Sequence, residues 1–382
     1  MRCSPPTFVS GIGKTKFGIL NKSIPELAYE AMFKALADSN LSINDIDMIY
    51  VANFAAGPLQ NQLQLNSLIA SLIPGINIPI LRIEAACASS GAAIYQAALM
   101  MNQVNNVMVI GVEKMTNINI HDATKSIGSA GDMIIDQKQG LIFPASYALV
   151  AQQHMLKYGT TEDDLALIAF KDHQNSKLNE LAHFFGKEVS MEMIKKSPVI
   201  CSPLKLFDCS PITDGAAAVI LSNKKRSDRD IEIVGSALAT DTISLSQRKD
   251  LTSFTATKIA SQSAYKQAKI KPSDIDVAEV HDCFTIAEII AMEDLGFCEK
   301  GEAKNLIRAG ETKIDGKIPI GPSGGLKGNG HPIGATGTSQ ICEIVQQLRG
   351  ESGNRQVKKA KIGLTHNIGG VGGTCAVHIL KK

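Results

Sequence analysis

Residues 44–51 (NDIDMIYV) recur farther along the chain as residues 273–280 (SDIDVAEV), so that Asp45 superposes on Asp274. Each copy follows a helix-like stretch and runs through a polar turn into an apolar, strand-like segment. A helix–turn–strand unit that occurs twice at a long separation indicates an internal repeat. The sequence therefore predicts two related halves.

The segments around the first copy alternate between strand-like and helix-like patterns. Residues 48–53 (MIYVAN) and 106–111 (NVMVIG) are short apolar runs, and residues 89–103 between them are rich in Ala, Leu and Met. Each half also has a turn rich in Gly and Ser or Thr that opens a helix, CASSG at Cys87 and GATGTS at Gly334. This alternation predicts an α/β fold with a mostly parallel sheet.

A different stretch, residues 116–207, interrupts the repeat before DGAAAVILSN (residues 214–223) returns to a strand pattern. We expect residues 116–207 to form an inserted loop domain, because long insertions in α/β enzymes often form a lid or a substrate-binding face. The N-terminal half then comprises residues 1–115 plus 208–228, and the C-terminal half comprises residues 229–382.

The composition is that of an ordinary globular protein and excludes several classes of function. The 382 residues are 44% apolar and 20% charged, with a formal net charge of +2, which gives no basic field for nucleic acid. No apolar stretch approaches the roughly 20 residues of a membrane span. Prolines and glycines interrupt the N-terminal segment MRCSPPTFVSGIGKTKFG, so it does not resemble a secretory signal. We expect a cytoplasmic protein.

Eight cysteines are scattered along the chain and none forms a CxxC pair. This distribution argues against a disulfide framework or a zinc site, and no metal is expected. Most of these cysteines are expected to be small buried residues.

Cys87 is followed by small residues, CASSGAA, at the predicted start of a helix. Backbone N–H groups and the helix dipole favour a thiolate at such a position, and small neighbours allow a thioester to approach. The segment predicts a nucleophilic cysteine, with a buried packing cysteine as the alternative.

His281 and Cys283 lie two residues apart in VHDCF, directly after the strand of the second copy. The carboxyl ends of strands in α/β proteins form the crevice in which ligands bind, so both side chains are candidates for the site. Asp282 between them is expected to point elsewhere and hold neighbouring backbone. Taken alone, His281 is equally consistent with a core histidine.

His331 stands in the glycine-rich segment GGLKGNGHPIGATG, residues 324–337. Clustered glycines require close backbone approach or positive φ. The segment is neither a phosphate-binding loop nor a dinucleotide-binding GxGxxG. A histidine on a backbone held this tightly favours a catalytic base.

A last glycine-rich turn, HNIGGVGG at residues 366–373, follows the final predicted strand. Its N–H groups could stabilise an oxyanion, or it could be only a tight turn. The early Gly11-Ile12-Gly13 is assigned no function.

Together, a cysteine at a helix start, HDCF, GHPIGATG and a terminal glycine-rich turn resemble the thiolase superfamily. The resemblance covers essentially the whole chain and is nearest to the sterol-carrier-protein-type thiolases, here without a carrier domain. It implies a five-layered α-β-α-β-α fold with two duplicated halves and an inserted loop domain that binds coenzyme A.

The resemblance also implies roles for the candidate residues. Cys87 would be the acyl-carrying nucleophile and His331 the base that activates it. His281 stands where many thiolases carry the Asn of an NEAF motif. Asn367 stands where they carry the acid/base Cys of a CIGG motif, and in the HDCF branch Cys283 takes that role from another strand.

Two further positions follow from the same resemblance. Gly369 matches the backbone donor that joins the Cys87 N–H in an oxyanion hole, and Ser210 matches a residue near the pantetheine arm of coenzyme A.

These roles imply thiolysis of 3-oxoacyl-CoA or the reverse Claisen condensation of acetyl-CoA through an acyl-cysteine. Coenzyme A and acyl-CoA are then substrates, and no metal or redox cofactor is required. We expect no nucleic-acid partner and no membrane span, and a homodimer or homotetramer as in the family. The alternatives are a decarboxylating ketoacyl synthase and a catalytically silent acyl-CoA-binding scaffold subunit.

Overall fold

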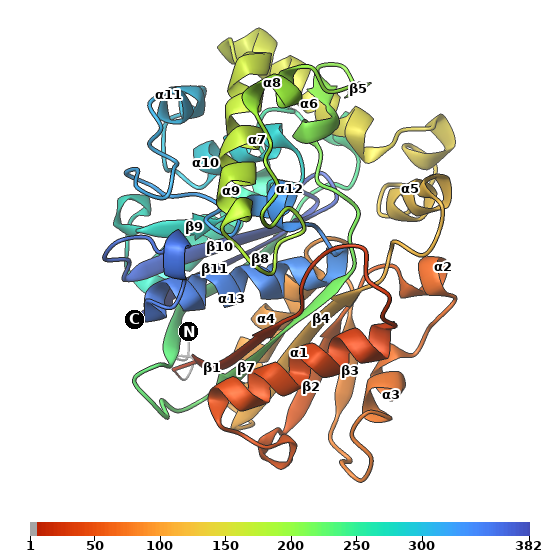
Figure 1. Cartoon of the computed structure of the whole chain (residues 1–382), viewed down its shortest axis with the longest axis vertical. Coiled ribbons are helices and arrows are strands. Elements are labelled where there is room, and N and C mark those ends of the chain that lie inside the picture. Colours follow the sequence, from red (N-terminus) through yellow and green to blue (C-terminus); the bar gives the residue numbers. More distant parts are fainter. Residues whose placement is uncertain (1–5) are drawn as a thin grey trace.

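The computed structural model describes residues 6–382, so Cys3 and the rest of residues 1–5 lie outside the described part. Nine strands follow one another by hydrogen bonding in the order β3-β2-β4-β7-β1-β8-β11-β10-β9 (Figure 1). Their bounds are β1 Phe8–Lys14, β2 Met48–Ala52, β3 Ile80–Ile83, β4 Asn106–Glu113, β7 Gly215–Ser222, β8 Ile231–Thr240, β9 Val277–Glu279, β10 Ile362–Gly369 and β11 Thr374–Lys381.

The helices and a small separate hairpin complete the regular structure. The helices are α1 Ile24–Ser39, α2 Ala56–Gln60, α3 Leu65–Ala70, α4 Ser89–Met100, α5 Ile120–Gly128, α6 Phe143–Tyr158, α7 Glu162–Lys177, α8 Met191–Lys195, α9 Thr255–Ala268, α10 Thr285–Asp294, α11 Ala303–Arg308, α12 Gly325–Asn329 and α13 Thr336–Arg349. The hairpin pairs β5 Val199–Cys201 with β6 Leu204–Lys205.

The internal repeat is present in the structure as two half-sheets of the same local order. The first copy of the repeat ends in β2, which pairs in parallel with β4, and the second ends in β9, which pairs in parallel with β10. The register is also repeated, because Met48 is opposite Val107 as Val277 is opposite Gly363. The prediction of two related halves is therefore confirmed.

The prediction of a mostly parallel sheet is wrong. β7 pairs antiparallel with both β4 and β1, and β11 pairs antiparallel with both β10 and β8. β11 returns from β10 through a tight glycine turn rather than a crossover helix, which makes an antiparallel hairpin. The two half-sheets are also joined, since Phe8 and Val9 of β1 pair with Glu232 and Ile231 of β8.

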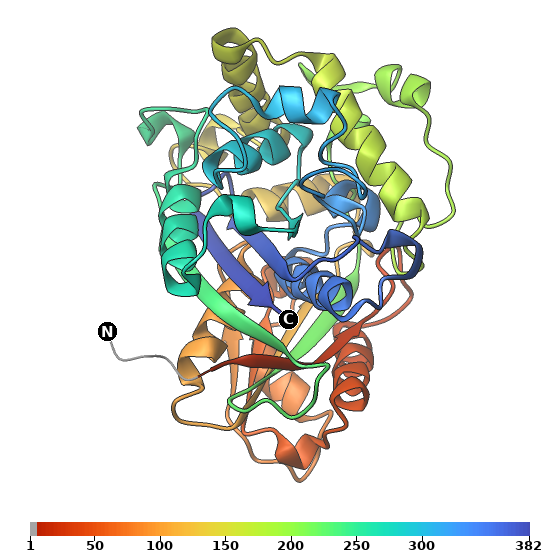
Figure 2. The same ribbon diagram turned by 90° about the vertical axis from the view of Figure 1, so that its left-hand side faces the viewer.

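Two helices lie between the half-sheets and two more cover the outer faces. Apolar side chains of α4 and α13 form one buried cluster with β1, β4, β7 and β9. α1 packs on β1 and β7, and α9 packs on β8 and β11. Figures 1 and 2 show the resulting stack, with the first half in red and orange below the second half in blue. This is the predicted five-layered arrangement.

The packing of α1 explains the early glycine pair. Ser23 and Glu26 form a capping box that begins α1, and Ala28, Ala31 and Ala35 are buried against the sheet. A Cβ at Gly11 would lie 2.3 Å from the carbonyl oxygen of Ala35, and one at Gly13 would lie 2.2 Å from that of Ala31. These glycines therefore allow close packing of helix on strand.

The chain between β4 and β7 forms a lobe that contains α5 to α8 and the β5–β6 hairpin. Figure 1 shows α6, α7 and α8 at the top of the molecule. α7 packs on α10, α11 and α12 of the second half. Within residues 6–382, none of the helices combines the length and the apolar character needed to cross a bilayer.

Candidate active site

A cavity of about 580 Å³ opens where the two halves and the lobe meet. Cys87, Cys283 and His331 line it together with Ser210, and mostly apolar side chains complete the walls. The motifs quoted from distant parts of the sequence thus converge on one site.

Cys87 lies at the tip of a strained turn between β3 and α4. Ala86 has a φ of 50°, an uncommon left-handed conformation for a residue with a side chain, and Ala88 caps α4. The Gly370 N–H donates to the Cys87 thiol, yet burial raises the pKa of that thiol well above its usual range. The expectation that the helix start alone favours a thiolate is therefore too simple, and the cysteine needs a base.

His331 is arranged to act as that base. Its Nδ1 is 2.6 Å from the Thr336 hydroxyl, which itself donates to the Pro332 carbonyl oxygen. Because the hydroxyl proton is already used, the network assigns the proton of the ring to Nδ1, and Nε2 keeps its lone pair. Burial lowers the pKa of His331 to about 4, so the ring is neutral near pH 7.

His281 is held in the opposite tautomer by Asn367. The Asn367 side-chain oxygen accepts from the Gly91 N–H, and its Nδ2 donates to the Cys87 carbonyl oxygen, which fixes the orientation of the amide. The same Nδ2 lies 3.2 Å from His281 Nδ1, which must accept. His281 therefore carries its proton on Nε2, a buried atom without a hydrogen-bond partner within the described residues.

The side chains of Cys87, His281 and His331 lie close together. One polar atom each of Cys87, His281 and His331 lies within 4.8 Å of the other two. The two imidazole rings are 5.1 Å apart between centroids and nearly perpendicular. These atoms also meet the distance criterion for a metal site, but a protonated Nε2 on His281 offers no lone pair to a metal.

Cys283 is buried beside the same cavity. Burial raises the pKa of its thiol to about 12, and the hydroxyl of Tyr147, which lines the same cavity, opposes that rise. The Ser210 N–H donates to the Cys283 carbonyl oxygen at 2.9 Å, which connects the predicted pantetheine residue to the second cysteine.

Asp282 points away from the cavity, as expected, and holds backbone. Its Oδ1 accepts from the Leu326 N–H at 2.8 Å, and its Oδ2 pairs with the buried ammonium of Lys327 at 2.6 Å. Lys327 also contacts Asp172 of α7 at 2.8 Å, so it joins the lobe to the His281–Cys283 turn. This contact could not be predicted from the sequence, because its members lie far apart along the chain.

The buried carboxylate of Glu113 fixes the loop that carries His331. It accepts from Asn53 Nδ2 and from the N–H groups of Phe54, Ala55 and Gly334, at 2.8 to 3.1 Å. Gly334 follows His331 by three residues, so this end of β4 holds the His331 segment of the other half.

Two consecutive glycines, Gly369 and Gly370, lie beside the Cys87 turn. The N–H of Gly370, the residue after Gly369, lowers the pKa of the Cys87 thiol. Gly369 lies in β10 opposite Thr374, and a Cβ there would lie 2.4 Å from the Ala85 carbonyl oxygen, directly beside the Cys87 turn.

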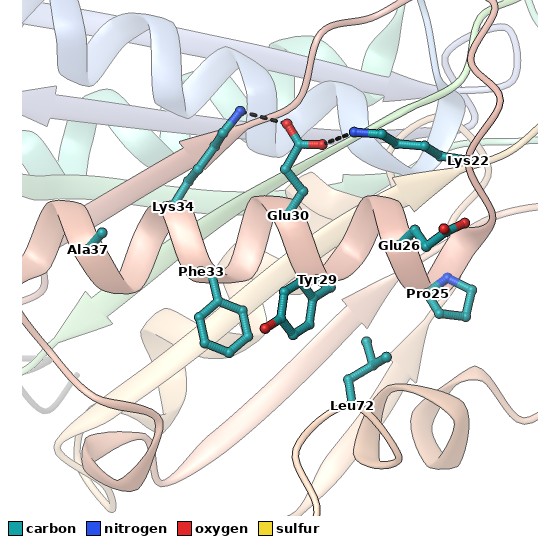
Figure 3. A pocket seen from close by; sticks show the side chains of 9 residues that line it. All are labelled: Lys22, Pro25, Glu26, Tyr29, Glu30, Phe33, Lys34, Ala37 and Leu72. Carbon is teal, nitrogen blue, oxygen red and sulfur yellow. Dashed lines mark hydrogen bonds and ion pairs between the residues drawn. The ribbon is translucent and has the colours of Figure 1, made fainter.

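A second hollow, of about 720 Å³, lies over α1. Figure 3 shows Glu30 paired with Lys22 and Lys34, while Tyr29 and Phe33 point to the other side of the helix. No cysteine or histidine is among the described residues that line it, so it lacks groups for acyl transfer.

Comparison with known families matches both halves of the chain. The family described as "Thiolase, N-terminal domain" matches residues 8–225, and "Thiolase C-terminal domain-like" matches residues 237–382. The chain belongs to the thiolase family.

Similar proteins agree with this assignment. An acetyl-CoA acetyltransferase of Methanothermobacter thermautotrophicus is 46% identical over 98% of this thiolase and 99% of its own length. Sterol carrier protein 2 of Bos taurus is 34% identical over 98% of this chain and 72% of its own, which confirms the predicted branch. This thiolase is an acyltransferase of the thiolytic or Claisen type.

Solved structures confirm the fold. The Ltp2-ChsH2(DUF35) aldolase superposes with a TM-score of 0.86 at 25% identity, over 99% of this chain and 98% of that one. Human mitochondrial 3-ketoacyl-CoA thiolase in complex with CoA superposes with a TM-score of 0.75 at 17% identity, over 100% and 98%.

Proposed function

We propose that this thiolase transfers acetyl groups between coenzyme A and Cys87, and makes or cleaves acetoacetyl-CoA or longer 3-oxoacyl-CoA. The observation that carries the proposal is the pair of opposite tautomers beside Cys87. His331 presents a lone pair and His281 presents a proton, as a base and an oxyanion donor require.

In the first step, His331 Nε2 removes the proton of Cys87 as the sulfur attacks the thioester carbon. The carbon–sulfur bond to coenzyme A breaks, and His331 returns the proton to the leaving thiolate. The acyl oxygen accepts from the N–H groups of Cys87 and Gly369. Because burial raises the pKa of Cys87, the proton leaves only as the bond forms.

In the second step, Cys283 as thiolate removes a Cα proton from a second acetyl-CoA. The thioester oxygen gains enolate character and accepts from Nε2–H of His281, joined by His331 when its Nε2 is protonated. The Cα carbon attacks the acyl group and releases the Cys87 sulfur. In cleavage, Cys283 protonates the departing carbon instead.

Coenzyme A is a substrate in this scheme, and thiols and imidazoles supply every proton movement. We place the pantetheine arm in the apolar cavity past Ser210, with the nucleotide end over the lobe. The relatives named acetyl-CoA acetyltransferase support acetyl-CoA as the donor.

We further propose a cytoplasmic homodimer or homotetramer that associates through the sheet of the first half. The support is that β3 is an edge strand in the described sheet and exposes Leu81 by 48%. Light scattering after gel filtration at micromolar concentration tests this, and a single monomer mass would count against it.

The proposed activity is tested by incubating the protein with radiolabelled acetyl-CoA and locating the label by peptide mapping. We expect label on Cys87, and CoA-dependent cleavage across a series of 3-oxoacyl chain lengths. Absence of label would favour a silent binding subunit. Carbon–carbon bond formation only from a malonyl thioester, unaffected by loss of Cys283, would favour a decarboxylating synthase.

A further inference from the structure

Tyr147, in the lobe helix α6, is held rigidly beside the two cysteines. Its side chain is 1% exposed. The ring stacks on Phe284 with centroids 4.5 Å apart and meets Phe254 edge-on at 6.4 Å. Aromatic neighbours on two sides fix the direction in which the hydroxyl points.

The hydroxyl of Tyr147 lies between two parts of the site. It donates to the Gly370 carbonyl oxygen at 3.0 Å, and it shares the cavity wall with Cys283, whose pKa it lowers. Gly370 in turn directs its N–H to the sulfur of Cys87. Tyr147, Cys87, Cys283 and Gly370 line the same cavity.

We propose that Tyr147 is a positioning residue that stabilises the thiolate of Cys283. This inference rests on the proposed function, in which Cys283 must lose its proton to act on Cα. When the thiolate forms, the hydroxyl turns its O–H from the Gly370 oxygen to the sulfur. A hydrogen bond to a charged acceptor is stronger than one to a neutral carbonyl, so the exchange favours the thiolate.

Tyr147 does not exchange its own proton in this step. Burial raises the pKa of the phenol well above its usual range, so it stays a donor. The Cα proton of the substrate ends on the Cys283 sulfur, and the enolate oxygen carries the negative charge. Tyr147 lies in the lobe and lines the cavity with Cys283, so the lobe supplies the donor that we assign to this sulfur.

Tyr147→Phe removes a single oxygen and keeps both ring contacts. Tyr265→Phe is the matched control, because the Tyr265 hydroxyl is also buried and donates to a backbone carbonyl, that of Leu295, away from the cavity. Both variants are compared with wild type for melting temperature and circular dichroism.

The first readout is independent of turnover. In a Cys87→Ser background, the rate at which iodoacetamide alkylates Cys283 is followed by peptide mass spectrometry at several pH values below 10. Tyr147→Phe is expected to slow alkylation about tenfold at a given pH, equivalent to about one pKa unit. Rates equal to those of the control would overturn the proposal.

The second readout measures condensation and the acetylation of Cys87 separately. Tyr147→Phe is expected to lower kcat for condensation about 10- to 100-fold with little change in KM, while acetylation of Cys87 changes by less than about threefold. A purely structural residue would give loss with Tyr147→Leu and none with Tyr147→Phe, which would also overturn the proposal. Failure of wild type to acetylate Cys87 would instead refute the proposed function, leaving the alkylation test of Tyr147 intact.

Discussion

The two halves share one framework but differ at the ends of their strands. In the first half, Asn53 after β2 and Glu113 at the end of β4 hydrogen-bond to each other and to backbone N–H groups. In the second half, His281 after β9 and Asn367 in β10 also bond to each other, but His281 leaves Nε2–H unpaired beside the cavity. The strand ends of the first half are thus fully hydrogen-bonded, whereas those of the second half leave one N–H donor, on His281, without a partner among the described residues.

The repeated register shows how closely these positions correspond. If Met48 is superposed on Val277, Gly111 of β4 falls on Asn367 of β10. A Cβ at Gly111 would lie 2.4 Å from the Gly334 carbonyl oxygen, so the His331 segment occupies the space that a side chain there would need. Of the two equivalent strand ends, one thus holds the loop of the other half and one holds His281.

The largest expected effect is at the nucleophile that the first half contributes. Cys87→Ser should lower acetyl transfer by about 10⁴-fold or more, because a hydroxyl is a far poorer nucleophile near neutral pH. Transfer of label from acetyl-CoA measures it, with Cys342→Ser, another buried cysteine, as the control. Persistent transfer, or loss of the fold in Cys87→Ser, would give Cys87 a structural role.

The next effect belongs to the second half alone. Cys283→Ala should slow condensation and thiolysis by about 10²–10⁴-fold while Cys87 still accepts an acetyl group. Parallel assays of acetylation and condensation separate the two steps. Near-normal turnover would move the proton shuttle to His281 or an ordered water. Adding Asn367→Cys should restore little activity, because it removes the amide that fixes the tautomer of His281.

The hydrogen bonds of Glu113, at the strand end of the first half, should matter for stability. Glu113→Gln replaces one acceptor oxygen by an NH₂ group, so two of its N–H partners lose their acceptor and the free energy of unfolding should fall by about 2–4 kcal/mol. Chemical denaturation measures this against Glu192→Gln, which affects only an exposed ion pair with Lys196. Equal stabilities of the two variants would remove the distinction between the strand ends.

The smallest effect concerns pH. Because burial lowers the pKa of His331 to about 4, its base form persists well below pH 6.5, and Cys87 acetylation should change less than about twofold between pH 5.5 and 7.5. Initial rates are compared over the pH range in which circular dichroism is constant. A tenfold fall with an apparent pKa near 6.5 would show that His331 titrates as an exposed imidazole.

The sequence predicts the framework well because its signals are local. The repeat marked β2 and β9 directly, and strand-end position correctly placed Cys283 at the cavity and His281 near Cys87 and His331. The role of Cys283 came from family resemblance rather than from spacing, and it stays a prediction, as does the assignment of domain boundaries. The mixed strand directions could not be predicted, because apolar runs do not reveal the direction in which strands pair.

The groups that tune the site were not predicted, because each acts through a partner far away in sequence. Thr336 sets the tautomer of His331, Glu113 holds the loop at Gly334, and Tyr147 faces Cys283 from the lobe. Each of these residue types is common in helices and strands, so only the folded contact distinguishes it.

The strand order has a consequence for how this enzyme folds during its synthesis. β10 and β11 are the last strands in the chain, yet they lie between β8 and β9 in the sheet. On the ribosome, β8 therefore lacks its partner β11, and β9 lacks its partner β10, until residues 362–381 emerge, and pairings of long sequence separation form slowly. β10 also carries Asn367, which contacts both the Cys87 carbonyl oxygen and His281 Nδ1. The surroundings of Cys87 are therefore complete only when β10 has joined the sheet.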